Sequence, residues 1–169
     1  MKTVFQGKIF TIKQGEKLGE PIEKAYRLPS VGIIPVTSSG KVILIKEYRP
    51  ERNESVIGMI AGCADKSSNI EKEAARELAE EAKLKAKNLK LFYTRKQGVS
   101  NEHKWYCFVA TGLEKTEAKH DEDEKITPFE CTLEEACNYA LGDNFRNETQ
   151  AYTLLKLRHD LQTGKFTLP

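Results

Sequence analysis

The chain has 169 residues, enough for one domain with its own hydrophobic core. Its 27 basic and 25 acidic side chains leave a formal net charge of +2, so composition indicates neither a nucleic-acid surface nor a membrane surface. No apolar run approaches the roughly 20 residues that cross a bilayer, and the first ten residues hold no long apolar signal region. We expect a reducing cytoplasm, with the four cysteines as buried small hydrophobic residues: Cys63, Cys107, Cys131 and Cys137.

The first third of the chain predicts β-structure. Residues 3–13 alternate between apolar and polar side chains, as a half-buried strand does. Residues 30–37 and 41–48 are rich in β-branched residues and are joined by Ser-Ser-Gly, a plausible turn. Residues 56–62 form another strand-like run. We therefore predict that strands precede the first helix.

A helix is predicted after these strands. Ser68 followed by Glu71 fits a capping box, in which the serine accepts from a backbone N–H and the glutamate reaches back to the cap. Apolar residues then recur at i, i+4 spacing, which predicts a buried stripe made of Ile70, Ala74, Leu78 and Ala82.

The second half predicts further strands and two helices. Residues 89–100 and 104–113 read as aromatic-rich strands around a turn at 97–102, and 126–132 as a short strand. Residues 114–126 form a polar loop of the kind that often carries function. Residues 133–143 and 147–164 read as helices, the latter burying Leu154, Leu155, Leu157 and Leu161. This order favours a mixed α/β sandwich over an alternating parallel-sheet fold.

Four glutamates gather on one face of the first helix. At about 100° per residue, Glu73, Glu77, Glu80 and Glu81 fall within roughly 100° of one another. Like charges at this spacing destabilise a helix by a few tenths of a kcal/mol each. One interpretation is a solvated face offset by neighbouring basic residues. The other is a site for Mg²⁺ or Mn²⁺, which prefer oxygen ligands and bind phosphates beside carboxylates.

The surrounding residues decide between these interpretations. The stretch 62–84 closely resembles the Nudix box: Gly, five residues, Glu, seven residues, then Arg-Glu-apolar-x-Glu-Glu-x-Gly-apolar. The matching positions are Gly62, Arg76, Glu77, Leu78, Glu80, Glu81 and Leu84. Ser68 stands where the family has its first Glu, and Lys83 where it has the late Gly. A lysine at such a helix end costs roughly 1 kcal/mol, or moves the end.

The resemblance extends beyond the box to the ADP-ribose pyrophosphatase branch of the family, over about residues 1–160. It implies an α/β (α+β) fold, a Nudix-type α/β/α sandwich with a mixed sheet in residues 31–169. An antiparallel β segment, residues 1–30, would precede the sandwich and form a homodimer. Three positions depart from this branch: Glu47 replaces a usual Gln, while Gly58 and Ile60 stand where Glu and Pro are common.

The same resemblance implies the metal ligands and the groups that handle protons. Glu77 and Glu81, with the backbone carbonyl of Ala61, would hold the metal, and Glu80 would complete the site. Arg76 would pair with one of these glutamates and fix its rotamer. The catalytic base would lie in the acidic loop, with Glu124 as first candidate and Glu122 as second. An ordinary solvated loop is the alternative for this acidic run.

Candidate substrate-binding residues are fewer and less specific. Arg49 is one because a guanidinium suits phosphate, although a surface salt bridge would also explain it. Arg27 is a second candidate, and the resemblance adds Gly98 and Glu102 from the turn at 96–102. Three aromatic residues are candidates for stacking on a base or for core packing: Tyr48, Phe92 and Trp105. The histidines show no ligand spacing and are assigned no metal.

The resemblance implies hydrolysis of the diphosphate of ADP-ribose or a related nucleoside diphosphate sugar, with Mg²⁺ as cofactor and Mn²⁺ as a possible substitute. The products would be a nucleoside monophosphate and a sugar phosphate. Two alternatives stay open. A Nudix-fold module that binds a nucleotide without cleaving it is suggested by Ser68, Lys83 and Gly58. A housecleaning nucleoside triphosphatase is disfavoured by the long N-terminal β segment.

Overall fold

The computed structural model describes residues 1–64, 69–117 and 125–169. These residues contain the helices α1 (Ile70–Ala82), α2 (Leu133–Ala140) and α3 (Glu148–Gln162). Their strands are β1 (Lys2–Gln6), β2 (Phe10–Lys17), β3 (Glu20–Arg27), β4 (Ser30–Pro35), β5 (Val42–Arg49), β6 (Glu54–Gly58), β7 (Ile60–Cys63), β8 (Leu84–Gln97), β9 (Asn101–Lys115) and β10 (Ile126–Cys131). No helix in the described ranges is long and apolar enough to cross a membrane.

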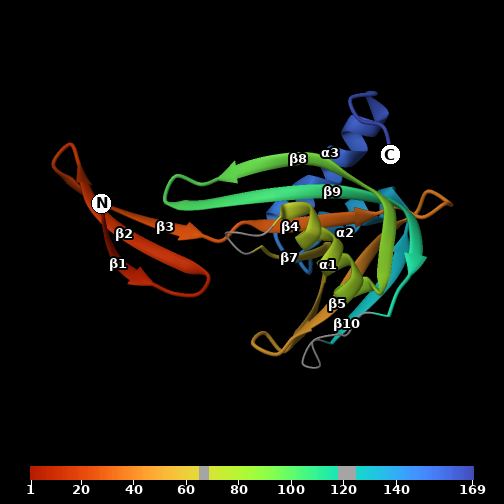
Figure 1. The fold of residues 1–169 in the computed structure, drawn as a ribbon, viewed down its shortest axis with the longest axis horizontal. Helices are drawn as coiled ribbons and strands as arrows, with labels where there is room; N and C mark the ends of the chain where they lie inside the picture. The colour runs from red at the N-terminus through yellow and green to blue at the C-terminus, as the bar shows by residue number, and fades with distance from the viewer. Residues whose placement is uncertain (65–68, 118–124) are drawn as a thin grey trace.

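The strands form two sheets. The larger has the order β1-β2-β3-β9-β4-β7, with β8 paired to β9, and the smaller has the order β10-β5-β6. The long strand β9 organises the larger sheet: it runs antiparallel to β8 along one edge and parallel to β3 and then β4 along the other. This combination makes the sheet mixed, as predicted. Figure 1 shows β8 and β9 curving together over the body of the molecule.

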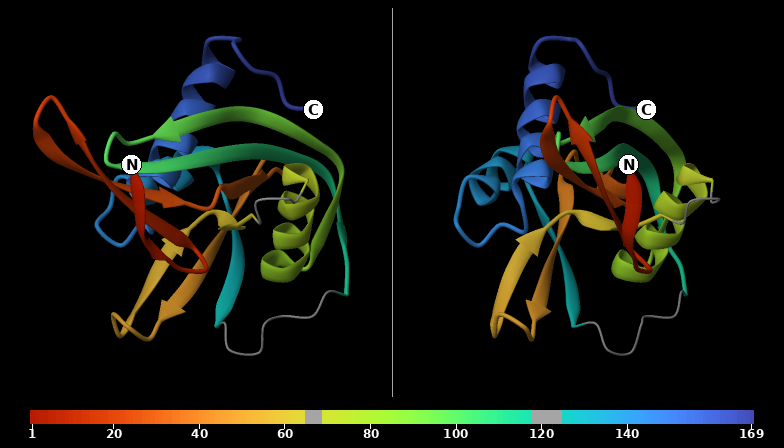
Figure 2. Two further views of the ribbon diagram at one scale, coloured as in Figure 1. Left: turned by 60° about the vertical axis from the view of Figure 1, so that its left-hand side comes forward. Right: turned by 90° about the vertical axis from the view of Figure 1, so that its left-hand side faces the viewer.

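Two hydrophobic clusters place the helices on opposite sides of the sheets. One joins residues of β4, β5 and β9 to α2 and α3, and includes Leu154 and Leu157. The other joins residues of the sheets to α1 through Ala74, Leu78 and Ala82, with Ile70 partly buried against it. The predicted apolar stripe of α1 is thus confirmed, as is the α/β sandwich. Figure 2 shows α1 on one side and α2 and α3 on the other.

Two predicted elements are divided in the structure. Residues 3–13 form two antiparallel strands, because the chain turns at Gly7, whose N–H donates to Phe10 O at 2.8 Å. Residues 56–62 divide at Met59 between β6 and β7, which lie in different sheets. The Met59 N–H donates to Gln150 Oε1 at 3.0 Å instead of to a neighbouring strand. The apolar pattern of residues 56–62 does not predict that the chain passes from one sheet to the other here.

The ends of α1 differ from the expected ones in one respect and agree in another. The predicted capping box is wrong: the N-cap is Asn69, whose Oδ1 accepts from Glu71 N at 2.9 Å and Lys72 N at 3.3 Å. Ser68 itself lies outside the described residues. At the other end Lys83 adopts φ 57° and ψ 38°, the left-handed conformation that the family pattern assigns to glycine. The helix therefore keeps its usual end and accepts the strain of a side chain there.

We expect Lys83→Gly to stabilise the protein by about 1 kcal/mol, because glycine reaches the left-handed region without steric cost. Chemical denaturation monitored by circular dichroism measures this change. Ala75→Gly is the matched control: Ala75 is exposed in the interior of the same helix, and glycine there should destabilise by about 1 kcal/mol. A loss of stability in both variants would contradict the strain argument.

Candidate active site

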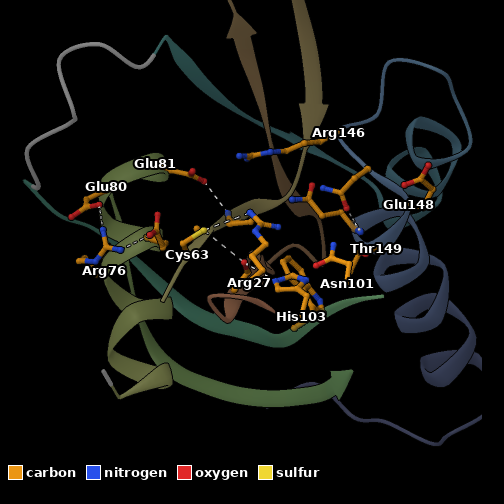
Figure 3. A pocket seen from close by; sticks show the side chains of 17 residues that line it. Arg27, Cys63, Arg76, Glu80, Glu81, Asn101, His103, Arg146, Glu148 and Thr149 are labelled. Atoms are coloured by element: carbon orange, nitrogen blue, oxygen red, sulfur yellow. Dashed lines mark hydrogen bonds and ion pairs between the residues drawn. The ribbon is translucent and has the colours of Figure 1, made fainter. Parts of the chain in front are cut away.

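A cavity of about 590 Å³ lies between α1, β7, the first half of β9 and the segment that leads into α3. Figure 3 shows the side chains around it. One wall carries carboxylates from α1, and the opposite wall carries Arg146 to Gln150. The floor comes from the ends of β3 and β4 and from β9. Residues far apart in the sequence therefore meet here because β9 pairs with both β3 and β4.

The acidic wall is held together by one arginine. The Arg76 guanidinium bonds to Glu77 and Glu80, and its Nε and Nη2 donate to Glu73 Oε2 at 3.1 and 3.0 Å. Burial opposes the charge of Arg76, but attraction to Glu77, the hydrogen bond to Glu73 and attraction to Glu80 outweigh it and raise the pKa of Arg76. The predicted pairing of Arg76 with these glutamates is thus seen, and it involves three carboxylates instead of one.

Two of the carboxylates are buried against the backbone of β7. Glu77 and Glu81 are 8% and 6% exposed, respectively. Glu81 Oε2 accepts from Ala61 N at 3.0 Å. Glu77 lies so close to Gly62 that a Cβ there would fall 2.0 Å from its Oε1. The glycine that opens the Nudix box therefore makes room for one of the box's own glutamates.

The floor of the cavity carries a small polar cluster that the sequence did not indicate. His103 Nε2 lies 3.0 Å from Ser30 Oγ, and Ser30 Oγ lies 3.9 Å from Cys63 Sγ. Arg27 Nη2 donates to the same sulfur at 3.6 Å. Cys63 is partly exposed, so the expectation of four buried cysteines fails for this one and is confirmed for the other three. Burial and the positive charge of Arg27 lower the pKa of His103 to about 4.

The wall opposite α1 contains a third arginine, which the sequence did not indicate. Arg146 lies within ion-pair distance of Glu47, 3.3 Å from Nη1 to Oε2, and Glu47 is only 7% exposed. Its aliphatic part covers Gly58, where a Cβ would fall 3.0 Å from Arg146 Cβ. Glu47 and Gly58 are two of the positions that depart from the ADP-ribose pyrophosphatase branch, and both contact Arg146.

The structure does not bring every candidate residue to the cavity. Ala61, Arg27, Arg76, Glu77, Glu80 and Glu81 line it. Arg49 instead pairs with Glu47 at 2.8 Å, and Glu102 with Lys24 and Lys96 at 3.2 and 2.7 Å. Gly98 lies in the β8–β9 turn with φ 75° and does not line the cavity. Glu122 and Glu124 lie outside the described residues.

The acidic wall has the carboxylate oxygens that a divalent cation needs as ligands, but they are not gathered around one point. Among the described residues, no three His, Cys, Asp or Glu side chains lie close enough together to hold a metal ion. Arg76 occupies the space between Glu77 and Glu80. Mg²⁺ is commonly bound through one or two carboxylates, with waters and substrate phosphates as the other ligands. The buried oxygens of Glu77 and Glu81 fit that mode of binding.

Comparison with known proteins agrees with this geometry. A model of the NUDIX domain matches residues 26–153, well over half of the chain. The chain is 33% identical over 143 residues to the ADP-ribose pyrophosphatase of Bacillus subtilis (strain 168), which covers 80% of this chain and 76% of that protein. It is 31% identical over 114 residues to the methanol dehydrogenase activator of Bacillus methanolicus, covering 65% of this chain and 61% of that one.

A solved structure described as an ADP compounds hydrolase shares the fold, with a TM-score of 0.79 at 22% identity over 96% of this chain and 92% of that one. The chain therefore belongs to the Nudix family, and it is a Nudix hydrolase of the ADP-ribose pyrophosphatase-like type.

The lowered pKa of His103 predicts a stability change at mildly acidic pH. The folded state takes up this proton at about pH 4 and the unfolded chain near 6.5, so stability falls as the pH drops from 6.5 toward 4. Between pH 7 and pH 5, the free energy of unfolding of the wild type should fall by about 2 kcal/mol more than that of His103→Gln. Urea denaturation at pH 7 and pH 5 measures the difference. His159→Gln, an exposed position on α3, is the control and should follow the wild type.

Proposed function

We propose that this Nudix hydrolase cleaves the diphosphate of ADP-ribose or a related nucleoside diphosphate sugar, in a reaction that requires Mg²⁺, with Mn²⁺ as a substitute. The observation that carries the proposal is the pair of buried carboxylates, Glu77 and Glu81, on one wall of a cavity that three arginines also line. The 33% identity to an ADP-ribose pyrophosphatase supports the substrate class. The products would be AMP and a sugar phosphate.

In this proposal Glu77, Glu80 and Glu81, with the carbonyl of Ala61, would hold the cation. When bound, a divalent cation neutralises charge on the diphosphate and lowers the pKa of a water molecule. Arg76 holds Glu77 and Glu80 in place, because it bonds to both. Glu124, or Glu122, remains the candidate that accepts the proton from water.

The first test is a panel of substrates with Mg²⁺ and Mn²⁺. We expect release of AMP from ADP-ribose, and a loss of roughly a hundredfold or more in kcat for Glu81→Gln, because the variant keeps the shape of the side chain but lacks the charge. Quantifying AMP by chromatography measures both. Glu71→Gln is the control: Glu71 is exposed in the first turn of α1 and does not line the cavity. ADP-ribose bound tightly but recovered intact would instead favour a binding module.

We also propose that the chain forms a homodimer through residues 1–30. Its strands β1 to β3 project from the body of the molecule in Figure 1. Six large apolar residues there are more than 40% exposed: Met1, Val4, Phe5, Ile9, Phe10 and Leu18. So many exposed apolar side chains in one projecting segment favour self-association. Because β3 also delivers Arg27 to the cavity, the dimer surface and the site would share one strand.

Light scattering tests the dimer. We expect a mass of twice the 19.1 kDa of one chain for the wild type, and 19.1 kDa for Phe5→Lys, since a charge would enter the apolar surface. Leu141→Lys is the control, because Leu141 is 70% exposed but lies at the end of α2. A wild type that scatters as a single chain would contradict the proposal.

A further inference from the structure

Three buried side-chain nitrogens in the described part of the chain lack a hydrogen-bond partner: Arg27 Nε, Trp105 Nε1 and Arg146 Nη1. All three are N–H donors, and all three residues line the same cavity. Buried donors are normally satisfied, so three exceptions around one cavity require an explanation. A ligand whose acceptors enter the cavity would supply the missing partners.

Trp105 is held in its place by the strand beside it. Its side chain is 4% exposed and packs directly over Gly32 of β4, where a Cβ would fall 2.2 Å from Trp105 Cζ2. Residue 105 pairs in register with Ser30, the neighbour of His103 on the cavity floor. An indole can donate a hydrogen bond but cannot accept one. Trp105 therefore places a fixed, unpartnered donor at the lining of the cavity, in addition to its role in the core.

Arg146 is held by its backbone, its stem and its charge. Its N–H donates to Ile57 O at 2.8 Å, which fixes the segment against β6. Its stem fills the space above Gly58, beside Gln150. Its Nη1 lies 3.3 Å from Glu47 Oε2 without making a hydrogen bond, and 23% of the side chain stays exposed. In Figure 3 the side chain extends into the cavity from the wall opposite Glu80 and Glu81.

Arg27 completes the set from the end of β3. Its Nη2 contacts the Cys63 sulfur at 3.6 Å, which is a weak acceptor, and its Nε has no partner. The three donors thus come from three separate elements and include two permanent positive charges. A neutral sugar would present donors as well as acceptors, whereas phosphoryl oxygens are acceptors only and match a guanidinium fork.

We propose that Arg27, Trp105 and Arg146 form a subsite for a phosphoryl group of the nucleotide, opposite the carboxylates of α1, and that Glu47 and Gly58 are positioning residues for Arg146. This proposal takes the identity of the nucleotide, ADP-ribose or a related compound, from the proposed function. Its new content is the role of Trp105 and of the Glu47–Arg146 pair. The carboxylates of α1 would then bind the substrate through a cation, while the donors of the floor and of the opposite wall would bind it directly.

The experiment compares Arg146→Met, Arg146→Lys, Trp105→Phe and Glu47→Gln with the wild type. We expect Arg146→Met to raise both the KM for ADP-ribose and the Kd for ADP, measured by calorimetry with Mg²⁺, by about tenfold or more. The change in kcat should be smaller than the change in KM. Arg146→Lys should fall between, because it keeps the charge but lacks the fork. Trp105→Phe and Glu47→Gln should each raise the Kd by a few-fold, roughly.

Arg158→Met is the matched control. Arg158 of α3 pairs with Glu134 of α2 at 2.8 Å, and it does not line the cavity. Thermal melting of each variant separates a loss of folding from a loss of binding. A wild type that hydrolyses no ADP-ribose overturns the proposed function, while ADP binding still tests the subsite. Unchanged ADP affinity in Arg146→Met and Trp105→Phe, or no ADP binding by the wild type, overturns the subsite.

Discussion

The site depends on the placement of two carboxylates against the backbone of one short strand. Glu77 and Glu81 lie one turn apart on α1, and both are buried where the helix meets β7. Moving a carboxylate out of water is expensive unless a donor or a cation compensates for it. The Ala61 N–H compensates in part for Glu81, and Arg76 in part for Glu77. The apolar stripe of α1 supplies the packing that keeps the two carboxylates there, through Leu78 and its neighbours.

This arrangement explains how far the sequence could predict the site. The spacing of the four glutamates and Arg76 is local, so helical geometry alone brings them to one face. The meeting of β3, β4 and β9 is not local. Arg27 and His103 are 76 residues apart in the sequence and come together because β3 pairs with β9. Arg146 was missed for the same reason. No spacing connects it with Gly58, yet β6 holds the two side by side.

The local errors have two physical origins. Ser68 and Asn69 are both good N-caps, and sequence patterns rank them almost equally. The strand-like run 56–62 has one continuous apolar pattern, but its two halves belong to different sheets. The break at Met59 is stabilised by Gln150, a buried residue of α3, which is 2% exposed. A polar side chain more than 90 positions away thus decides where a strand ends. The pattern of neighbouring residues cannot predict such a long-range contact.

Three glycines show why the cavity has two chemically different walls. Gly62 gives room to Glu77, Gly32 to Trp105 and Gly58 to Arg146, because a Cβ at any of them would crowd those side chains. The first admits an acid on the side of α1, and the other two admit donors. The resemblance to the ADP-ribose pyrophosphatase branch leads us to expect a glutamate at position 58, and here the stem of Arg146 packs against the glycine instead. Glu47 lies within ion-pair distance of this guanidinium, which it would orient in the proposed subsite. This arrangement puts the carboxylates of α1 and the guanidinium of Arg146 on different sides of one cavity, which the proposed binding of a metal-bound diphosphate requires.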